Sequence, residues 1–500
     1  MAGAPSHPRR ARAARRVIAR LMAPPLAALV AAAALALPHP ARASGLDAPI
    51  LGTGQSGPAV ADAAAVYWNP AQLAWMDKTE LLLGGGLVIG HATYQRDRRG
   101  TYQTPDTLQF KSPLDPANVD AGKTGLAEEV SATPIAPLGD AFLAYPLLKD
   151  RLVMGLGAYV PYAAALGFPE DGAQAWQIRQ AFIVASQVTA SAGVRVTDEI
   201  AVGAGLSYVG GFAELSKLQD FSSLSEFQRA FSSDPINQDN DFGPDAPTEV
   251  RELDSLSRPI SIKRAFSHGV TFNLGISYRP RKDLGIGLTY QHGSKMRYKG
   301  EFAINMDHDF FTGDLASQGL KYKPLVTGDA ELSFSLPRRI TAGASYDPSD
   351  KLRINGFVSY ISYSDIDAFV VETTSPDLAQ PELSIGDKVT VTLPRDWNDT
   401  VWVEASGHYK LNDRMLVSAA LGYQSPASPD STIDTASPDG HRLISGFGGI
   451  LQVTDTISLM GDVRLQAILP REVTTSDMDL GNGTYTLFIA FVGGHLKILL

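Results

Sequence analysis

Apolar and polar residues alternate one by one along many segments of this chain. In the run 456–468, every odd position from Ile457 to Ala467 is apolar or glycine, whereas most even positions are polar. The runs 270–279 and 400–410 largely repeat this alternation. Because successive side chains of a β-strand point to opposite faces, each run predicts a strand with one apolar and one polar face.

Strands with one apolar and one polar face occur both in soluble β-sandwiches and in membrane barrels. The lengths of the connections between the strands distinguish these two folds. Short links at 149–150, 197–199, 280–283, 347–350, 411–413 and 454–455 alternate with long connections. The long connections cover 96–134, 164–179, 213–265, 305–327, 368–396, 425–439 and 469–483. A bacterial outer-membrane barrel has short periplasmic turns, long outer loops, a lipid-facing apolar face and a polar lumen. The pattern therefore predicts such a barrel.

We expect fourteen antiparallel strands, an even number that is typical of these barrels. They lie near 79–95, 135–147, 151–163, 180–195, 199–212, 266–279, 284–304, 328–346, 351–367, 397–410, 414–424, 440–452, 456–468 and 484–500. Every backbone polar group in lipid needs a partner, so the sheet must close on itself. The barrel is therefore expected to occupy 79–500, with both ends on the periplasmic side.

The first 43 residues resemble a cleaved signal peptide. Six Arg between Arg9 and Arg20 precede an apolar stretch at 26–37, and Ala41-Arg42-Ala43 fits a cleavage site, so we expect the mature chain to start at Ser44. Removing 1–43 takes away seven Arg and no acidic residue, which moves the formal net charge from −10 to −17. Such acidity excludes a general nucleic-acid binder, and the absence of Cys excludes disulfides.

The segment 44–78 precedes the first expected strand and has no alternating pattern of its own. It contains three glycines, a helix-prone alanine-rich run, and then Tyr67-Trp68-Asn69-Pro70-Ala71. A fourteen-stranded barrel leaves space inside it. We therefore expect an all-β, 14-stranded antiparallel transmembrane barrel with a small N-terminal hatch in its lumen.

Three motifs carry a family resemblance that covers the mature chain in order. Residues 60–71 (VADAAAVYWNPA) resemble the N-terminal signature of the FadL/TodX family of outer-membrane transporters. Residues 393–400 (LPRDWNDT) and 438–442 (PDGHR) resemble two later motifs of that family. The resemblance implies a fourteen-stranded barrel with a hatch that takes up long-chain fatty acids or other hydrophobic compounds.

The hatch motif Tyr67, Trp68, Asn69, Pro70 and Ala71 has two compatible interpretations. Proline disfavours a helical conformation in the residue before it, so the helix should end near Trp68. Asn69 can bond the local backbone and fix the turn. The turn either wedges the hatch in place or also sets the position that opens the pathway.

An apolar groove is expected on two outer loops. Residues at spacings of three and four within 213–265 predict a helix with one apolar side, and a second loop supplies the facing wall. The groove residues are Leu215, Leu218, Phe221, Leu224, Phe227, Phe310, Phe311 and Leu315. The alternative is that this helix packs on the barrel rim. In the family, helical outer loops form such a groove.

Strand 151–163 contains Gly155, Gly157 and Pro161, which weaken a ladder of hydrogen bonds. They predict either a curved strand end or a lateral opening, and the family resemblance implies sideways release of substrate into the membrane. Arg179, Lys263 and Arg264 lie near expected strand ends on the loop side, where each is a possible partner for a substrate carboxylate or for lipopolysaccharide phosphates.

Taken together with the family resemblance, these features predict passive inward transport of hydrophobic compounds. The resemblance implies long-chain fatty acids first, whereas the groove residues do not discriminate between fatty acids, aromatic hydrocarbons and other lipids. Capture on the groove precedes hatch rearrangement and lateral release. The alternatives are a non-selective porin for polar solutes and an outer-membrane lipase, but no hydrolase motif or metal spacing occurs. We therefore expect no catalytic residues, metal or cofactor. The expected partners are hydrophobic small molecules or fatty acids, outer-membrane lipid, lipopolysaccharide and the outer-membrane assembly machinery, around a monomeric barrel.

Overall fold

The computed structural model describes residues 56–97, 101–103, 109–111, 128–220, 257–317, 322–381, 386–477 and 479–500. The expected signal peptide and the groove residues Phe221, Leu224 and Phe227 lie outside this part of the chain. The described side chains also exclude those of Phe310 and Leu315.

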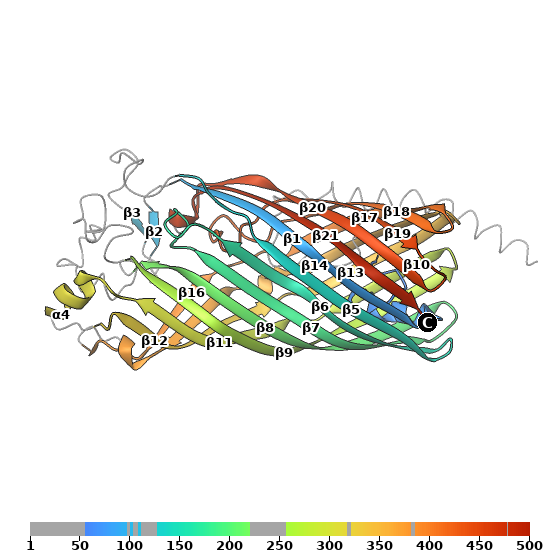
Figure 1. Cartoon of the computed structure of the whole chain (residues 1–500), viewed down its shortest axis with the longest axis horizontal. Helices are drawn as coiled ribbons and strands as arrows, with labels where there is room; N and C mark the ends of the chain where they lie inside the picture. The colour runs from blue at the N-terminus through green and yellow to red at the C-terminus, as the bar shows by residue number, and fades with distance from the viewer. Residues whose placement is uncertain are drawn as a thin grey trace, which may run out of the picture.

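The described strands close into one antiparallel barrel, whose long axis is horizontal in Figure 1. Closure occurs at β1 (Glu80–Arg96), which pairs with β21 (Gly483–Leu499) on one side and with β4 (Val130–Ala132) and β5 (Ile135–Leu148) on the other. The next strands are β6 (Leu152–Gly167), β7 (Gln180–Arg195), β8 (Ile200–Asp220), β9 (Ser257–Arg281), β10 (Leu284–Gln291), β11 (Ser294–Asn305), β12 (Leu325–Leu336) and β13 (Arg338–Ser349). The barrel continues through β14 (Leu352–Ser362), β15 (Ala368–Thr374), β16 (Lys388–Pro394), β17 (Thr400–Asn412), β18 (Met415–Gln424), β19 (Arg442–Gln452) and β20 (Ile457–Val473).

Five of the strands that run the length of the barrel are interrupted, so that each is divided into two consecutive strands. The divided strands are β4 with β5, β10 with β11, β12 with β13, β14 with β15, and β16 with β17. Counted this way, the described barrel has the fourteen strands that the sequence predicted. A separate pair, β2 (Thr101–Gln103) and β3 (Gln109–Lys111), lies beyond the barrel wall. None of the described helices is long and apolar enough to cross a membrane.

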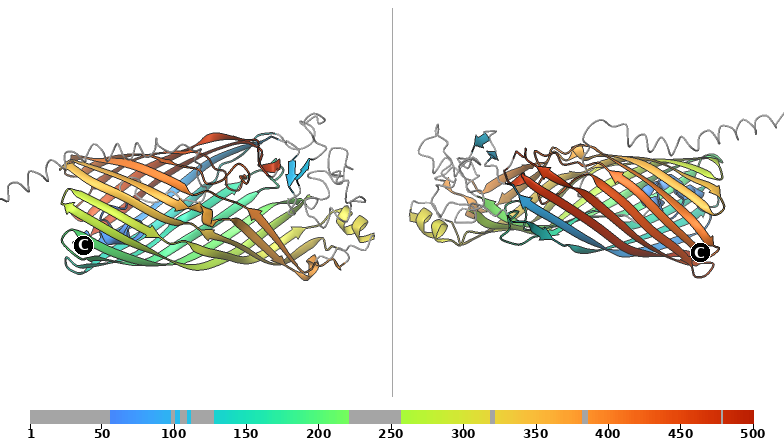
Figure 2. Two further views of the ribbon diagram at one scale, coloured as in Figure 1. Left: turned by 180° about the vertical axis from the view of Figure 1, so that it is seen from behind. Right: turned by 90° about the horizontal axis from the view of Figure 1, so that it is seen from above.

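The hatch, defined here as residues 56–78, contains the short helix α2 (Ala65–Trp68) and the 3₁₀ turn η1 (Pro70–Trp75). It is drawn in the darkest blue inside the barrel end that carries the C-terminus, as both views of Figure 2 show. The tight turns, including 148–151 and 196–200, lie at this same end, which is therefore the periplasmic end. Its residues are mostly buried, as expected for a plug in the lumen.

The outer surface of the barrel is apolar over the half nearest the tight turns, as expected for a surface in contact with lipid. Large apolar side chains stand exposed there on alternate positions, for example Leu206 at 61%, Val270 at 64% and Leu421 at 70%. Rows of outward aromatic rings border this apolar band toward the outer end, including Phe182, Phe212 and Phe266 in mutual contact. Aromatic girdles of this kind mark the membrane interfaces of outer-membrane barrels.

The polarity of the wall inverts toward the outer end of the barrel. On β11 the side chains of Lys295, Arg297 and Lys299 point outward, whereas Met296 and Tyr298 are buried inside. The strands β12, β15 and β16 share this arrangement of polar outside and apolar inside. A wall that is polar on its outer face cannot lie in hydrocarbon, so this part of the barrel projects beyond the lipid.

Local irregularities of one residue cause the inversion. The chain breaks at His292 and Gly293 between β10 and β11, and β9 bulges at Arg264, whose φ is 50°. A slip of one residue moves every following side chain to the opposite face of a strand. The sequence analysis treated 284–304 as one strand, and that prediction was wrong about its continuity.

One helix prediction was also wrong in part. Leu215 and Leu218 belong to β8, which continues to Asp220 in register with β9. The ladder with β9 satisfies the backbone of both strands, and this outweighs the helical spacing of the leucines.

Candidate functional site

Asn69 joins the hatch to itself and to the barrel wall. It has an extended backbone between α2 and η1, and its side-chain oxygen accepts a hydrogen bond from the Ala71 amide at 3.1 Å. Its Nδ2 donates to the carbonyl oxygens of Pro58 at 2.9 Å and Ile276 at 3.1 Å. The helix ends at Trp68 as the sequence predicted, and the turn is a structural wedge; its part in opening the pathway stays a prediction.

A girdle of inward-facing glycines makes room for the hatch. At each of these positions a Cβ atom would approach a hatch atom to within 3 Å. The girdle glycines are Gly155, Gly193, Gly203, Gly275, Gly287 and Gly343. They come from β6, β7, β8, β9, β10 and β13, so half of the barrel wall is shaped around the hatch.

Two arginines clamp the end of the hatch nearest the tight turns. The guanidinium carbons of Arg195 and Arg279 each lie 4.8 Å from the ring centre of Trp75. The indole Nε1 of Trp75 donates to the Ser277 hydroxyl at 2.9 Å. Cation–π contacts add to the apolar burial that holds the hatch in the lumen.

An acidic pair joins the N-terminal part of the hatch to β1. The Glu80 carboxylate accepts a hydrogen bond from the Ala63 amide at 3.0 Å and an ion pair from Lys497 at 2.6 Å. Asp62 accepts the Ser56 hydroxyl at 2.6 Å. Burial, followed by the nearby negative charge of Glu80, raises the pKa of Asp62 to about 6.

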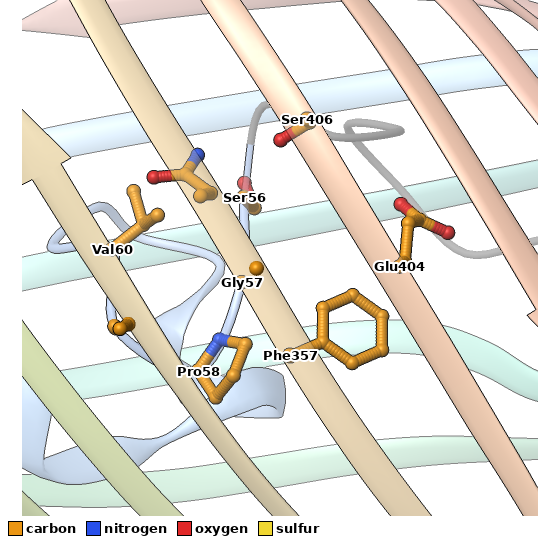
Figure 3. Close-up of a pocket in the computed structure, with 11 residues that line it drawn as sticks. Ser56, Gly57, Pro58, Val60, Phe357, Glu404 and Ser406 are labelled. Atoms are coloured by element: carbon orange, nitrogen blue, oxygen red, sulfur yellow. The ribbon is translucent and has the colours of Figure 1, made fainter. Parts of the chain in front are cut away.

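A small pocket between the hatch and the wall is shown in Figure 3. Hatch residues from Ser56 to Val60 line it together with Phe357, Glu404 and Ser406. Its volume of about 10 Å³ accommodates about one water molecule. At this point the hatch therefore packs closely on β14 and β17 and leaves no room for an apolar ligand.

Aromatic and cationic side chains meet on the outer side of the hatch. Trp68 lies 5.4 Å from Phe357 and 6.2 Å from Trp402, measured between ring centres. Arg339 and Arg464 stand over the ring of Trp402 at 5.8 and 5.3 Å. We call Trp68, Trp402, Arg339 and Arg464 the cationic shelf.

The shelf holds polar groups in a buried setting. Arg339 donates to the Tyr67 hydroxyl at 3.1 Å, and Arg464 pairs with Glu404 at 2.5 Å. Within the part of the chain that the structure describes, the indole Nε1 atoms of Trp68 and Trp402 are buried without a hydrogen-bond partner. Buried donors of this kind are costly unless a further acceptor reaches them.

The barrel interior beyond the shelf is apolar. Side chains of β11, β12 and β15 pack there with a turn residue from the outer loop, and we call them the apolar lining. Its large members include Met296, Tyr298, Phe302, Phe311, Phe334 and Phe369. Leu215 packs against the same group, whereas Leu218 packs with Trp176 and Ala175. Of the predicted groove residues, the structure thus brings Leu215 and Phe311 to one apolar surface.

One barrel wall shows the order of these layers along the lumen. From the tight turn at its end, the consecutive strands β13 and β12 carry Gly343 against the hatch, then Arg339 on the shelf, then Phe334 in the apolar lining. A molecule entering from the outer end would meet apolar side chains first, cations second and the hatch last.

The wall is incompletely paired beside β6. Pairing of β5 with β6 stops at Ala141 and Ala158, although β5 and β4 continue along β1. Among the described residues, no ladder joins the stretch 159–167 of β6 to β4 or β5. A bulge between Tyr159 and Tyr162, around Pro161, bends β6 here.

The three residues predicted for a lateral opening have different surroundings. Pro161 lies at the bulge beside the unpaired edge. Gly155 and Gly157 face the lumen, where Val66 of the hatch lies against both positions. The glycines therefore accommodate the hatch, and the role of this edge as an exit stays a prediction.

The three predicted carboxylate partners lie apart from the shelf. Arg179 pairs with Glu170 at 2.6 Å. Lys263 and Arg264 lie inside β9 and are exposed at its bulge, not at a strand end, because β9 extends much farther than expected. The sequence analysis missed Arg339 as a functional candidate. Arg464 stood on the polar face of the run 456–468, so that alternation was a usable signal.

The described residues contain no group of three or more His, Asp or Glu side chains able to hold a metal ion. The site contains an apolar lining, then buried aromatic and cationic side chains with the acid Glu404 paired to Arg464, and then the hatch.

Comparisons with known proteins show relatives of this chain and structures with the same fold. A putative outer membrane protein of Neisseria meningitidis is 22% identical over 391 residues, covering 77% of this chain and 76% of the relative. A FadL homologue of Pseudomonas aeruginosa has a similar structure, with a TM-score of 0.70, 18% identity, and coverage of 91% of this chain and 99% of that chain. The toluene transporter TbuX of Ralstonia pickettii aligns with a TM-score of 0.58 and 16% identity over 89% of this chain and 96% of that chain.

At these identities the structural matches show the fold alone, but the family match goes further. The family described as outer membrane protein transport protein (OMPP1/FadL/TodX) matches residues 26–488. The chain therefore belongs to this family of outer-membrane channels for hydrophobic compounds, which are transporters and not enzymes.

Proposed function

We propose that this chain carries long-chain fatty acids inward across the outer membrane without an energy source. The observation that carries this choice is the cationic shelf at the end of an apolar lining. A fatty acid has an apolar chain and one carboxylate, and the lumen offers the matching chemistry in that order.

The shelf favours a carboxylate over an uncharged hydrocarbon. TbuX of Ralstonia pickettii and TodX of Pseudomonas putida are described as toluene transporters. Toluene would gain from the apolar lining but would make no use of buried guanidinium groups. Arginine binds carboxylates through charge-assisted hydrogen bonds, which are stronger than neutral ones.

The proposed pathway begins at the outer end and leaves through the wall. Substrate enters the apolar lining, its carboxylate reaches the shelf, and the hatch rearranges. Exit occurs at the unpaired edge of β6, because transfer of each CH₂ from water to an apolar medium is favourable by about 0.8 kcal/mol. Sideways release into lipid avoids exposing the chain to the aqueous periplasm.

The proposal includes the remaining partners of a protein in this location. We propose that residues 1–43 are removed on export and that the assembly machinery inserts the barrel as a monomer. Surrounding outer-membrane lipid and lipopolysaccharide then contact its apolar and polar belts.

Two adjacent arginines provide a matched test. Arg339 points into the lumen, whereas Arg338 points outward and pairs with Asp365. We expect Arg339→Gln to weaken binding of oleate about tenfold and to slow its uptake, since a charge-assisted hydrogen bond is lost. Arg338→Gln should leave both unchanged, and methyl oleate should bind the two variants equally. Equal oleate affinity in both variants would refute the fatty-acid assignment.

A non-selective porin remains the competing function, and conductance separates the two. The close packing of the hatch predicts that the purified protein gives no large stable ohmic pore in planar bilayers. Such a pore in the unmodified protein would favour the porin.

A further inference from the structure

We propose that the outer face of β11 is a binding site for the phosphate groups of lipopolysaccharide, formed by Lys295, Arg297 and Lys299. We call these residues the basic stripe. The inference concerns the outside of the barrel and does not depend on which compound passes through it.

The stripe follows from strand geometry. Residues two apart in a strand share a face, so the three cations project outward in one row. At about 3.3 Å per residue, the row from Lys295 to Lys299 spans about 13 Å, which is enough to contact more than one phosphate group.

The level of the stripe matches the lipid headgroups. Lys299 pairs in register with Phe266 of β9, which belongs to the outward aromatic row. Three residues before Lys295, His292 stacks on Phe272 of the apolar band. The stripe therefore lies between Phe272 of the apolar band and the level of Phe266 in the aromatic row, and aromatic residues of this kind mark the membrane interface.

Neighbouring acids leave the stripe with excess positive charge. Glu331 on β12 lies 4.0 Å from Arg297 and 3.4 Å from Lys299. Glu301, farther out, lies 3.9 Å from Arg264. The carboxylate of Glu331 thus faces two of the three cations, and exposed ion pairs of this kind hold their partners weakly. The chain as a whole has a formal net charge of −10, so this local excess of positive charge is opposite in sign to the overall charge.

The surface beside the stripe is apolar. Phe266 and Val270 on the adjacent β9 are 54% and 64% exposed. A ligand that carries phosphate groups next to acyl chains would contact cations and apolar side chains together. Lipopolysaccharide in the outer leaflet has this chemistry, whereas a soluble protein partner would not need the lipid-facing residues.

The experiment uses the full-length protein in detergent and deep-rough lipopolysaccharide as the probe. Binding is measured by native mass spectrometry and by the rise in Tm. The variant K295Q/R297Q/K299Q should bind at least tenfold more weakly, since each cation near such a surface contributes to attraction. The control K149Q/K282Q/K351Q removes three exposed cations at the periplasmic end and should bind like the unmodified protein.

Further variants separate the effect of charge from that of side-chain shape, and a folding check excludes misfolded protein. K295R/K299R keeps the charge and should retain binding, whereas dephosphorylated lipopolysaccharide should bind weakly to every variant. Barrel integrity is checked by heat-modifiable migration, and the single variant K295Q, with the same expected sign, replaces a triple variant that fails to fold. Equal affinity of the stripe variants and the unmodified protein would overturn the proposal. So would equally tight binding of phosphatidylglycerol.

Discussion

At the scale of single residues, the hatch fits inside the barrel because the wall carries glycines, which have no side chain, where it approaches the hatch. A Cβ atom on Gly203 would lie within 3 Å of the backbone of Pro70 and Ala71. Backbone atoms cannot move aside as the end of a flexible side chain can. The glycine girdle is thus the part of the wall most sensitive to a single methyl group.

We expect Gly203→Ala to loosen the hatch while the barrel stays folded. Overpacking of this kind typically costs about 1–3 kcal/mol, which is enough to shift a docked hatch toward displaced positions by about tenfold or more. Conductance in planar bilayers should rise in frequency or size. Gly461→Ala is the control, because no atom lies within 4 Å of its Cβ position, and an equal effect in both variants would contradict the girdle.

The second prediction at this scale concerns Asp62 and pH. Its pKa of about 6 in the folded protein, against the ordinary 3.8 of an aspartate, means that the folded state holds the proton more tightly. Stability from this group therefore increases as pH falls from about 6 to about 4 and is absent above both values. Charged groups facing Asp62 are Glu80, Lys497, His495 and Arg353.

We expect Asp62→Asn to stabilise the docked hatch at pH 7.5 by on the order of 2 kcal/mol, because no charge is then buried. The unmodified hatch should gain hydrogen-exchange protection between pH 7.5 and 5, and the variant should gain less. Asp413→Asn, in an exposed tight turn, serves as the control. Identical pH dependence of the hatch in all three proteins would rule out Asp62 as the titrating group.

At the scale of elements, the sequence predicted the strands well where alternation is unbroken. The strand expected at 180–195 coincides with β7. The expected loop 368–396 was wrong in part, because it contains the barrel strands β15 and β16. What alternation could not show was the slip at Gly293 or the bulge at Arg264, because one extra residue only interrupts the pattern locally. The apolar lining was missed for the same reason, since its polarity is the reverse of the lipid-facing half.

The unpaired edge of β6 gives a prediction at this scale. Tyr159 and Tyr162 pair with Gln187 and Ala185, so β6 carries one extra residue between them. Deleting Pro161 removes that residue and keeps Tyr162 and Ala164 facing inward. The straightened strand should then pair with β5 beyond Ala158, which would reduce fatty-acid uptake severalfold without unfolding the barrel.

Deletion of Pro470 is the matched control. It lies in a comparable bulge of β20, between Ile468 and Arg471, far along the wall from the unpaired edge. Uptake should be near normal in that variant. If both deletions transport equally well, the edge of β6 is not the exit.

At the scale of the whole molecule, the inverted polarity divides the barrel into a lipid-embedded part and a projecting part. Leu288 and Arg297 both point outward on the consecutive strands β10 and β11, but they lie on opposite sides of the break at Gly293. If the division is correct, lipid shields Leu288, whereas Arg297 faces water outside the cell. A chain without Cys allows both positions to be tested by single cysteines with no background.

We expect a membrane-impermeant maleimide to label Arg297→Cys on intact cells and to leave Leu288→Cys unlabelled, because a thiol in hydrocarbon neither ionises nor meets the reagent. Lys282→Cys, in the periplasmic turn between β9 and β10, should react only after the outer membrane is permeabilised. These three outcomes fix the orientation of the barrel and the level of its outer boundary. Labelling of Leu288→Cys on intact cells would show that the outer boundary of the lipid lies nearer the periplasmic end than we propose. The basic stripe would then lie outside the headgroup region.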